Sequence, residues 1–533
     1  MLPGSHPDPS ILRVGDDYYL ANSTFEWCPG VRLHHSRDLV NWVAVGGVLG
    51  EDRLLNLTGC PDSAGVWAPN LTYADGLFYL VYSNVSTYAG GFTDCPNYVV
   101  TASTIEGPWS DPVLLHARGF DASLFHDGDE SWLLNLVHDW RPGHGGSAGL
   151  EATRFDRREL RLVGDPEQIE LPKGADWIEG PNLYRIGDWY YLLTADGGTG
   201  YNHQVTVSRS RALHGPYERD PDGPLITARD RPDLALQKAG HGSLVETPEG
   251  EWYLAYLVAR PHGRHGPCIL GRETALAPVT WTRYEWPGVP TGRPADVVPA
   301  PTEHGATVTA DLGSGVAAPT RDGFDDAVLG PQWSTLRRHA SPEWLSLTER
   351  ASHLRLRGGR SPRSMLGASL VARRADAPCC GFEATLDYRP HGIQHLAGIT
   401  AYYNSENWYF LHVTLDDDGR AVLRVAGSDR GRVTVDESGR HVLDEVCLSR
   451  LRLGLDLAGG ELTFRYDAGE GWRTIGAVYD ATVLSDEHAQ VFEDGQIRAL
   501  GFTGAFLGLW AWDLTGGSHP ADFDDASYAP VPT

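Results

Sequence analysis

Residues 178–192 read IEGPNLYRIGDWYYL, which is a short apolar segment, a polar turn and an aromatic segment that ends on a leucine. The same succession occurs five times in the first part of the chain. The aromatic segments are residues 18–20, 78–80, 132–134, 190–192 and 252–254. The intervals between their final leucines are 60, 54, 58 and 62 residues. Aromatic runs bounded by polar turns favour β-strands, so the spacing predicts five similar groups of strands.

A second pattern recurs in phase with the first. It reads SRDLVNW over residues 36–42, STIEGPW over residues 103–109 and SRALHGPY over residues 210–217. A unit of about four strands repeated around an axis is a β-propeller, which usually has roughly 4–8 blades. Five units therefore predict a five-bladed propeller. A stacked sandwich is the alternative, but it would not give such long and even spacing.

A second all-β domain is predicted after the repeats. They stop near Val258, and residues 281–305 are rich in proline and glycine, which is typical of a linker. From Gly323 onward the pattern alternates, as in SLVARR over residues 369–374, and this favours a β-sandwich. The predicted fold is all-β: a five-bladed β-propeller over residues 1–300, followed by a jelly-roll-like β-sandwich over residues 301–533.

Composition excludes several classes of partner. The net charge is −26, so no basic stripe is available for a nucleic acid or an anionic membrane. The seven cysteines include no C-x-x-C pair, which argues against a zinc site or a disulfide framework. Neither a signal peptide nor a membrane-spanning apolar run is evident. We therefore expect a cytoplasmic protein whose substrate is small enough to be imported.

The repeat also aligns a set of polar residues. An aliphatic residue precedes each aromatic segment: Ile11, Leu71, Leu124, Leu183 and Leu244. We expect it to lie on the innermost strand of its blade, and the start of that strand faces the central channel. Just upstream of it, equivalent positions in the five units hold Asp8, Trp67–Ala68, Asp121, Glu179 and His241. The fold is therefore expected to bring three carboxylates onto one small ring.

Burying like charges together is costly and raises pKa values, so three carboxylates on one ring indicate a use. Glycosidic cleavage needs one protonated carboxyl group to donate to the leaving oxygen and one ionised group to activate water, and a third can hold up the pKa of the acid. Taken singly, Asp8 reads as a turn residue, Asp121 as a strand cap, Glu179 as a solvated loop residue and His241 as a core histidine. Because all four residues stand at equivalent positions of the repeat, the catalytic interpretation is favoured. His241 would then adjust the charge of the site or bind a cation.

At these residues the chain resembles glycoside hydrolase family 43, the five-bladed propellers of clan F. It is similar in particular to the intracellular β-xylosidase and α-L-arabinofuranosidase group with a C-terminal sandwich. The resemblance covers nearly the whole chain. The motifs that carry it include PGSHPDPSI (3–11), VWAPNL (66–71), IEGPNLY (178–184), QKAGHGSLVET (237–247), LGRETAL (270–276) and FTGAFLGLW (502–510).

The resemblance implies an inverting mechanism. Asp8 would be the general base, Glu179 the general acid, and Asp121 the residue that positions Glu179 and keeps it protonated. Arg272 would bind a sugar hydroxyl and interact with the acidic residues, or else brace the last blade through an ion pair. The resemblance requires no cofactor, but it allows a structural Ca²⁺ in the propeller channel beside His241.

The resemblance also implies the walls of the pocket. Phe25 and Trp67 would line the site of the terminal sugar, although Trp67 could equally fill the space between blades. Phe506 would reach over from the C-terminal domain and close one side, and its alternative is a place in the sandwich core.

We expect an exo-acting enzyme that releases terminal β-D-xylose from short xylo-oligosaccharides with inversion. The first alternative is an α-L-arabinofuranosidase, as the sole or a second activity. The second alternative is a non-catalytic sugar-binding propeller. The expected partner is a small oligosaccharide, and a homo-oligomer is compatible with the sequence.

Overall fold

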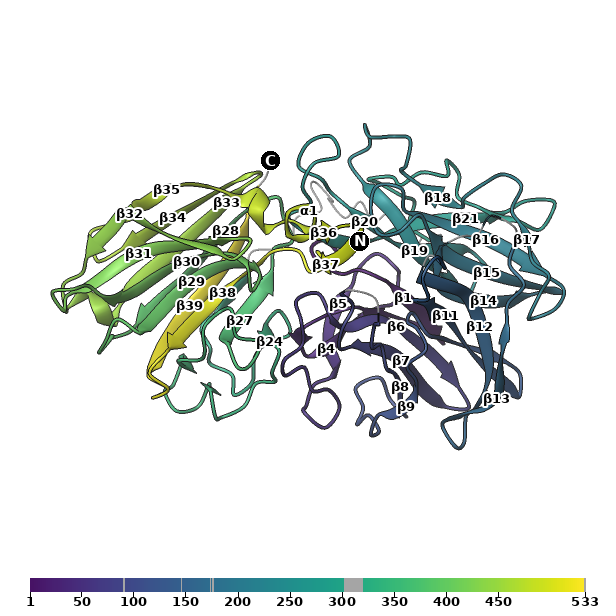
Figure 1. Cartoon of the computed structure of the whole chain (residues 1–533), viewed down its shortest axis with the longest axis horizontal. Helices are drawn as coiled ribbons and strands as arrows, with labels where there is room; N and C mark the ends of the chain where they lie inside the picture. Colours follow the sequence, from purple (N-terminus) through teal and green to yellow (C-terminus); the bar gives the residue numbers. More distant parts are fainter. Residues whose placement is uncertain (90–91, 145, 173, 175–176, 302–319, 532–533) are drawn as a thin grey trace.

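The computed structural model describes residues 1–89, 92–144, 146–172, 174, 177–301 and 320–531. Two all-β bodies lie side by side, the propeller made by the first part of the chain and the sandwich made by the second (Figure 1). The predicted fold class is confirmed. No helix among the described residues is long and apolar enough to cross a membrane.

The first three blades of the propeller are antiparallel four-stranded sheets. Their strands are β1 (Ser10–Val14), β2 (Asp17–Asn22), β4 (Gly30–Ser36) and β5 (Val43–Leu49); β6 (Gly65–Ala74), β7 (Leu77–Val85), β8 (Asn97–Ala102) and β9 (Val113–His116); and β10 (Ser123–Asp127), β11 (Glu130–Asp139), β12 (Gly146–Asp156) and β13 (Arg161–Gln168).

The fourth and fifth blades repeat this order, and the fourth carries one additional short strand, β18, paired with β16. Their strands are β14 (Ile178–Ile186), β15 (Trp189–Asp196), β16 (Gln204–Ser210), β17 (Glu218–Arg219) and β18 (Ile226–Thr227); and β19 (Gln237–Glu246), β20 (Trp252–Ala259), β21 (Arg272–Trp281) and β22 (Pro287–Gly288).

The register of the blades follows the sequence repeat. In four blades the apolar residue of the innermost strand pairs directly with the leucine of the aromatic segment. These pairs are Ile11–Leu20, Leu71–Leu80, Leu183–Leu192 and Leu244–Leu254. In the third blade Leu124 pairs with Leu133 rather than with Leu134, so the repeat is one residue shorter there than the spacing of the leucines predicts.

The sandwich consists of two eight-stranded sheets. One contains β23 (Thr320–Asp322), β25 (Leu345–Ser346), β26 (Leu354–Arg357), β28 (Cys379–Asp387), β33 (Leu451–Ala458), β34 (Glu461–Asp467), β35 (Arg473–Asp480) and β39 (Pro520–Pro530). The other contains β3 (Trp27–Cys28), β24 (Ser334–Leu336), β27 (Ser369–Arg374), β29 (His395–Asn404), β30 (Asn407–Leu415), β31 (Ala421–Asp429), β32 (Arg432–Val442) and β38 (Phe506–Asp513). Apolar side chains of both sheets, such as Phe382 and Leu509, form one buried core.

The strand β3 connects the two bodies. It lies in the chain between β2 and β4 of the first blade, yet Trp27 pairs with Leu336 and Cys28 with Thr335 of β24. The amide of Arg337 also donates to the carbonyl of Glu26 at 2.9 Å. The second sheet of the sandwich therefore ends on a piece of the propeller chain.

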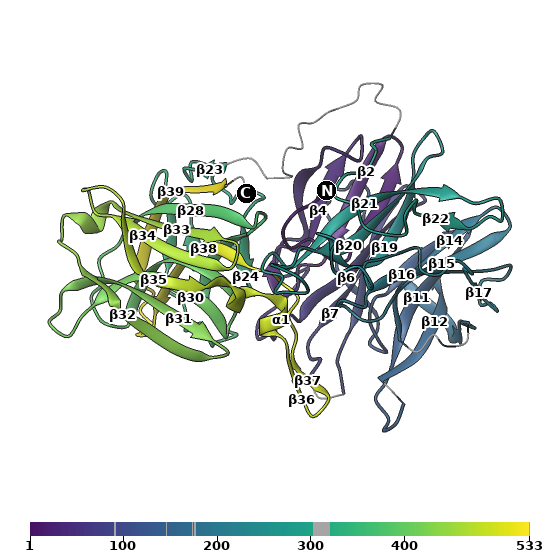
Figure 2. The same cartoon turned by 90° about the horizontal axis from the view of Figure 1, so that it is seen from above.

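A segment between β35 and β38 reaches from the sandwich toward the propeller. It contains η3 (Ala481–Leu484), α1 (Asp486–Ala489), β36 (Val491–Glu493) and β37 (Gln496–Ala499), whereas η2 (Cys447–Ser449) precedes β33. Figure 2 shows the β36–β37 hairpin projecting along the propeller. The predicted domain boundary at residue 300 adjoins residues 302–319, which lie outside the described residues, so it stays a prediction.

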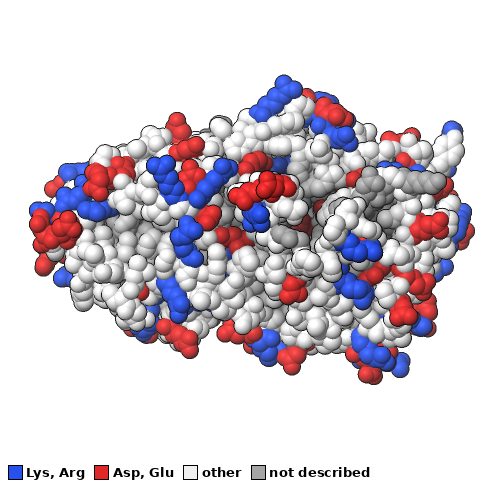
Figure 3. Space-filling model, in the orientation of Figure 1, with Lys and Arg blue, Asp and Glu red and all other residues white. Residues whose placement is uncertain are grey.

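Acidic and basic side chains are interspersed over the face seen in Figure 3.

Candidate active site

The innermost strands begin with an unusual backbone conformation at one repeated position. In each blade the residue three places before the buried Ile or Leu has a positive φ. These residues are Asp8 (52°), Ala68 (33°), Asp121 (54°), Gly180 (58°) and His241 (37°). Residues other than glycine seldom adopt such a φ, because it brings Cβ close to the backbone. The repeat of this conformation identifies a ring of five structurally equivalent positions.

This ring corrects the predicted phase of Glu179. Asp8 and Asp121 occupy equivalent positions in their blades, but the equivalent residue in the fourth blade is Gly180. Glu179 therefore stands one residue earlier, as Trp67 does before Ala68 in the second blade. The three acids do not form a symmetric set, because Glu179 leaves the backbone at a different point from the two aspartates.

Asp8 is held by a short polar relay. Its Oδ2 accepts a hydrogen bond of 2.6 Å from the hydroxyl of Ser23, which in turn accepts one of 2.8 Å from the amide of Ala68. Its Oδ1 lies 3.6 Å from Nδ1 of His241 and 3.6 Å from Nη1 of Arg272. Ser23 thus fixes one carboxylate oxygen of Asp8, and the other oxygen lies beside His241 and Arg272.

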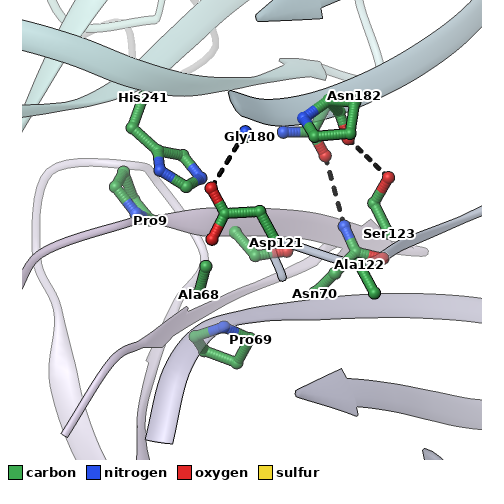
Figure 4. A pocket seen from close by; sticks show the side chains of 12 residues that line it. Pro9, Ala68, Pro69, Asn70, Asp121, Ala122, Ser123, Gly180, Asn182 and His241 are labelled. Carbon is green, nitrogen blue, oxygen red and sulfur yellow. Dashed lines mark hydrogen bonds between the residues drawn. The ribbon is translucent and has the colours of Figure 1, made fainter. Parts of the chain in front are cut away.

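Asp121 is attached to the backbone of the neighbouring blade. Its Oδ2 accepts a hydrogen bond of 2.9 Å from the amide of Gly180 (Figure 4). Burial raises the pKa of Asp121 well above its ordinary value, and the charges of Glu179 and Asp8 act in the same direction. Asp121 therefore anchors the residue that follows Glu179.

The carboxylate of Glu179 is held by the indole of Trp177, which donates a hydrogen bond of 3.1 Å to Oε2. Burial raises the pKa of Glu179 to about 7, while the Trp177 indole opposes this by stabilising the carboxylate. Asp8 raises the pKa further and Arg272 lowers it. A carboxyl group with a pKa near 7 is suited to donate a proton at neutral pH.

Two residues further along each innermost strand, a second ring of polar side chains lies in the channel. Asn70 donates to Asn182 at 3.2 Å and Ser123 donates to the carbonyl of Pro181 (Figure 4). Asn182 donates in turn to the carbonyl of Gly242 at 3.2 Å. The ring consists of Ser10, Asn70, Ser123, Asn182 and Ser243, one residue per blade. All of these except Ser243 line a pocket of about 10 Å³, which Asp121 and His241 also line. This is the size of about one water molecule. These side chains leave room for little more than one water molecule at this level of the channel.

Arg272 brings unpaired donors to the acids. Its side chain is buried, and neither Nε nor Nη2 has a hydrogen-bond partner within the described part of the chain. A buried hydrogen-bond donor without an acceptor destabilises the protein unless a ligand or a water molecule accepts its hydrogen bond. The guanidinium lies 4.2 Å from the ring centroid of Phe502 and 5.5 Å from that of Phe25, so it presents its free donors within an aromatic frame.

Three aromatic rings form that frame. Phe502 is 5.7 Å from Phe25 and 5.7 Å from Trp67, measured between ring centroids. The Trp67 indole donates to the carbonyl of Ser63 at 2.9 Å, which fixes its ring. Phe25 and Trp67 come from the propeller and Phe502 from the sandwich, so both domains build the walls.

The structure corrects the prediction for Phe506. This residue opens β38, is 1% exposed, and stacks on Trp27 with ring centroids 3.9 Å apart. The β-sheet register directs it into the interface between β3 and the sandwich. Phe502, which precedes the strand and is free of its pairing, takes the position at the site that was predicted for Phe506.

An ion pair fastens the sandwich segment that carries Phe502. Lys238 of β19 pairs with Glu487, and Oε2 of Glu487 accepts a hydrogen bond of 2.7 Å from the amide of Cys268. The neighbouring Asp486 accepts from the hydroxyl of Tyr403 at 2.8 Å. Its pKa is raised to about 6 by burial, although Lys238 opposes the shift. The contacts of Glu487 with Lys238 and Cys268 hold this segment of the second domain against the propeller.

Burial lowers the pKa of His241; the neighbouring Asp8 opposes this shift and Arg272 adds to it. Ca²⁺ prefers six to eight oxygen ligands, whereas His241 and Asp8 offer one nitrogen and one carboxylate. No group of three or more His, Cys, Asp or Glu side chains among the described residues is arranged to hold a metal ion. These two residues alone do not fit a calcium site, and the ion stays a prediction.

Three residues of the site were not anticipated: Ser23, Trp177 and Phe502. Ser23 lies in the segment STFEW and Trp177 two residues before Glu179, so both adjoin predicted residues. The signal for Phe502 was the motif FTGAF, which contains two phenylalanines. The two phenylalanines differ in that β38 begins at Phe506, so Phe506 is part of the sheet and Phe502 is not.

Comparison with known proteins gives two consecutive family matches. The family described as "Glycosyl hydrolases family 43" matches residues 1–287, and the "Beta xylosidase C-terminal Concanavalin A-like domain" matches residues 321–529. A xylan 1,3-beta-xylosidase of Vibrio sp is 42% identical, over 99% of this chain and 98% of that protein. A xylosidase/arabinosidase of Humicola insolens is 41% identical, over 100% and 97%. The crystal structure of a xylan beta-1,4-xylosidase from Bacillus halodurans has a TM-score of 0.92 at 43% identity and covers 99% of both chains.

Proposed function

Because the chain belongs to family 43 of the glycosyl hydrolases, we propose that it releases the terminal β-D-xylose of short xylo-oligosaccharides with inversion at the anomeric carbon. The observation that carries this proposal is the buried group of Asp8, Asp121 and Glu179 facing a guanidinium with unpaired donors. Sugar hydroxyls can accept from Arg272, while the aromatic frame packs on the ring of the sugar.

The proposed reaction is a single displacement. Asp8 takes a proton from a water molecule as the water oxygen bonds to the anomeric carbon. The bond from that carbon to the glycosidic oxygen breaks, and the oxygen receives the proton of Glu179. Asp8 ends protonated, Glu179 ends ionised, and the released sugar has the opposite anomeric configuration. Asp121 positions the acid through the amide of Gly180.

The stereochemistry and the sugar preference test the proposal together. We expect ¹H NMR of fresh product from xylobiose to show α-xylose first, with β-xylose appearing only by mutarotation. Initial β-xylose would mean a retaining mechanism and different roles for the acids. Parallel kcat/KM values on 4-nitrophenyl β-D-xylopyranoside and 4-nitrophenyl α-L-arabinofuranoside measure the preference.

An α-L-arabinofuranosidase activity is the second candidate function, because a relative at 41% identity is named a xylosidase/arabinosidase. A higher kcat/KM on the arabinofuranoside than on the xyloside would make it the main activity. The relatives also differ in the linkage named, 1,3 in one and 1,4 in another, so both xylobioses belong in the assay.

The alkaline side of the pH profile is expected to report Glu179. Because its pKa is about 7 and the acid must be protonated, kcat/KM falls as the pH rises through about 7. Trp177→Phe removes the donor that stabilises the carboxylate, so the pKa of Glu179 rises and the alkaline limb moves to higher pH. The pH dependence of kcat/KM on xylobiose measures both.

Trp189→Phe is the matched control, because its indole donates to Glu285 at 3.0 Å and has no part in the site. We expect this control to leave the alkaline limb in place. A Trp177→Phe profile that is unmoved, or displaced to lower pH, would contradict the assignment of that limb to Glu179.

A cytoplasmic location and a homo-oligomer stay predictions. Cell fractionation and light scattering test them.

A further inference from the structure

Two buried arginines meet where the sandwich adjoins the first blade of the propeller. Arg32 of β4 is 3% exposed, and Arg374, the last residue of β27, is 8% exposed. The hydroxyl of Ser334 on β24 accepts a hydrogen bond of 2.8 Å from Nη2 of Arg32, and it lies 3.5 Å from Nη1 of Arg374. The two guanidinium groups therefore converge on one point between the domains.

The other hydrogen bonds of these arginines are with uncharged groups. Arg32 donates to the carbonyls of Pro331 and Trp333, and Nε of Arg374 donates to the carbonyl of Ser5 at 2.6 Å. Within the described part of the chain, neither arginine forms an ion pair with an Asp or Glu side chain. Carbonyl oxygens satisfy the donors but carry no net charge, so two like charges lie buried together.

Buried guanidinium groups keep their protons and therefore need an opposite charge. Burial lowers the pKa of Arg32 to about 10, which leaves this side chain charged at neutral pH. Burial and the charge of Arg32 also lower the pKa of Arg374, but guanidinium groups remain protonated in proteins. Removing a charge from water destabilises a protein strongly unless an opposite charge lies close by. The pair is therefore suited to hold an anion.

Two buried nitrogen atoms beside the pair have no hydrogen-bond partner among the described residues. They are Nε of Arg32 and Nδ1 of His34, and His34 is 6% exposed. Arg32 and His34 stand two residues apart on β4, so their side chains leave the same face of the strand. Burial lowers the pKa of His34 to about 3, and the charges of Arg32 and Arg374 act in the same direction. The neutral imidazole can donate from one nitrogen.

The arginine pair also contacts the segment that precedes the proposed base. Ser5 accepts from Arg374, and the ring centroid of His6 lies 4.9 Å from that of His34. Ser5 and His6 stand three and two positions before Asp8. An ion held by the arginines would thus join the N-terminal segment, the first blade and the sandwich.

We propose that a halide ion, chloride in solution, binds between Arg32 and Arg374 and joins the two domains. A spherical anion accepts hydrogen bonds from any direction, which suits two guanidinium groups, the hydroxyl of Ser334 and the free nitrogen of His34. The burial of these side chains favours a small monovalent ion over a polyatomic one. The site includes none of the three acids, so the inference goes beyond the proposed reaction and does not depend on it.

The halide site is tested by the melting temperature of the full chain in sodium chloride and in sodium gluconate at the same ionic strength. We expect a Tm higher by about 2 to 4 °C in chloride, because a ligand that binds the folded protein alone stabilises it. Arg374→Met removes one charge and keeps an unbranched side chain beside the ring of Phe506, which lies 5.3 Å from the guanidinium. In this variant the two salts should give the same Tm.

Arg338→Met is the matched control. Arg338 also belongs to the sandwich and donates to a carbonyl and a serine hydroxyl, those of Ala368 at 3.0 Å and Ser369 at 2.6 Å. This variant should keep the full difference between chloride and gluconate. A parent protein that melts at the same temperature in both salts overturns the site. A difference that persists in Arg374→Met also overturns it, because the effect would then come from chloride bound elsewhere.

Bromide locates the ion directly, and it decides the question if Arg374→Met does not fold. Crystals of the full chain soaked in sodium bromide should show an anomalous scattering peak within hydrogen-bonding distance of both Arg32 and Arg374. Peaks confined to the molecular surface would overturn the site. Neither measurement uses turnover, so a failure of the proposed function leaves both outcomes interpretable.

Discussion

We expect Glu179→Gln to lower kcat on xylobiose by about 10²- to 10⁴-fold. Glutamine keeps the shape of the side chain and an oxygen that can accept from Trp177, but it cannot supply a proton to the leaving oxygen. On 4-nitrophenyl β-D-xylopyranoside the loss should be far smaller, because nitrophenolate leaves with little need of protonation. Steady-state kinetics on the two substrates measures the difference.

Glu130→Gln serves as the control, since Glu130 is an exposed residue of β11 whose contact is an ion pair with Arg154 at 3.4 Å. It should match the parent on both substrates. A Glu179→Gln protein that processes xylobiose like the parent would exclude the acid role and favour a sugar-binding propeller. Equal losses on both substrates would point to a binding role for Glu179.

We expect Asp8→Asn to lower kcat by about 10²- to 10⁴-fold on xylobiose and on the aryl xyloside alike. The attack of water needs a base whatever group departs, so leaving-group quality cannot compensate. Asparagine can still accept from Ser23, so the local fold should be kept. Comparing this variant with Glu179→Gln distinguishes the base from the acid, because only the loss of the acid should be smaller on the aryl xyloside than on xylobiose.

Asp17→Asn is the control for this substitution, because Asp17 pairs with His35 at 2.8 Å on the same blade but away from the channel. It should retain the activity of the parent. If the loss in Asp8→Asn were confined to xylobiose, Asp8 would have to act on the leaving group, and the direction of the proposed displacement would be reversed.

The blades could be predicted from the sequence because their information is local. Strand-forming aromatic runs and polar turns recur with each hairpin, and the pairing of Ile11 with Leu20 follows from one tight turn between them. The same repeat was enough to bring Asp8 and Asp121 to one ring. The left-handed backbone that defines the ring is not visible in residue types. The offset of Glu179 could nevertheless be counted, because Glu179 stands four residues before Leu183, whereas Asp121 stands three before Leu124.

Contacts between the domains could not be predicted in the same way. Phe502 and Phe506 share one motif, and which of them meets Arg272 depends on where β38 begins. Trp27 lies within the first blade of the sequence, but its partners are Leu336 and Phe506. Such choices are made by packing between residues more than 200 positions apart in the sequence, on which local patterns carry no information.

The seat of β3 in the sandwich bears on how such proteins can be divided or recombined. Cutting the chain between the bodies would leave Trp27 uncovered and the β3 edge without its partner, and unpaired edges promote association. The sandwich would lose β3, the edge strand of its second sheet. A functional transplant of the C-terminal module would need residues 27–28 to travel with it, so the two bodies are expected to be inherited as a single piece.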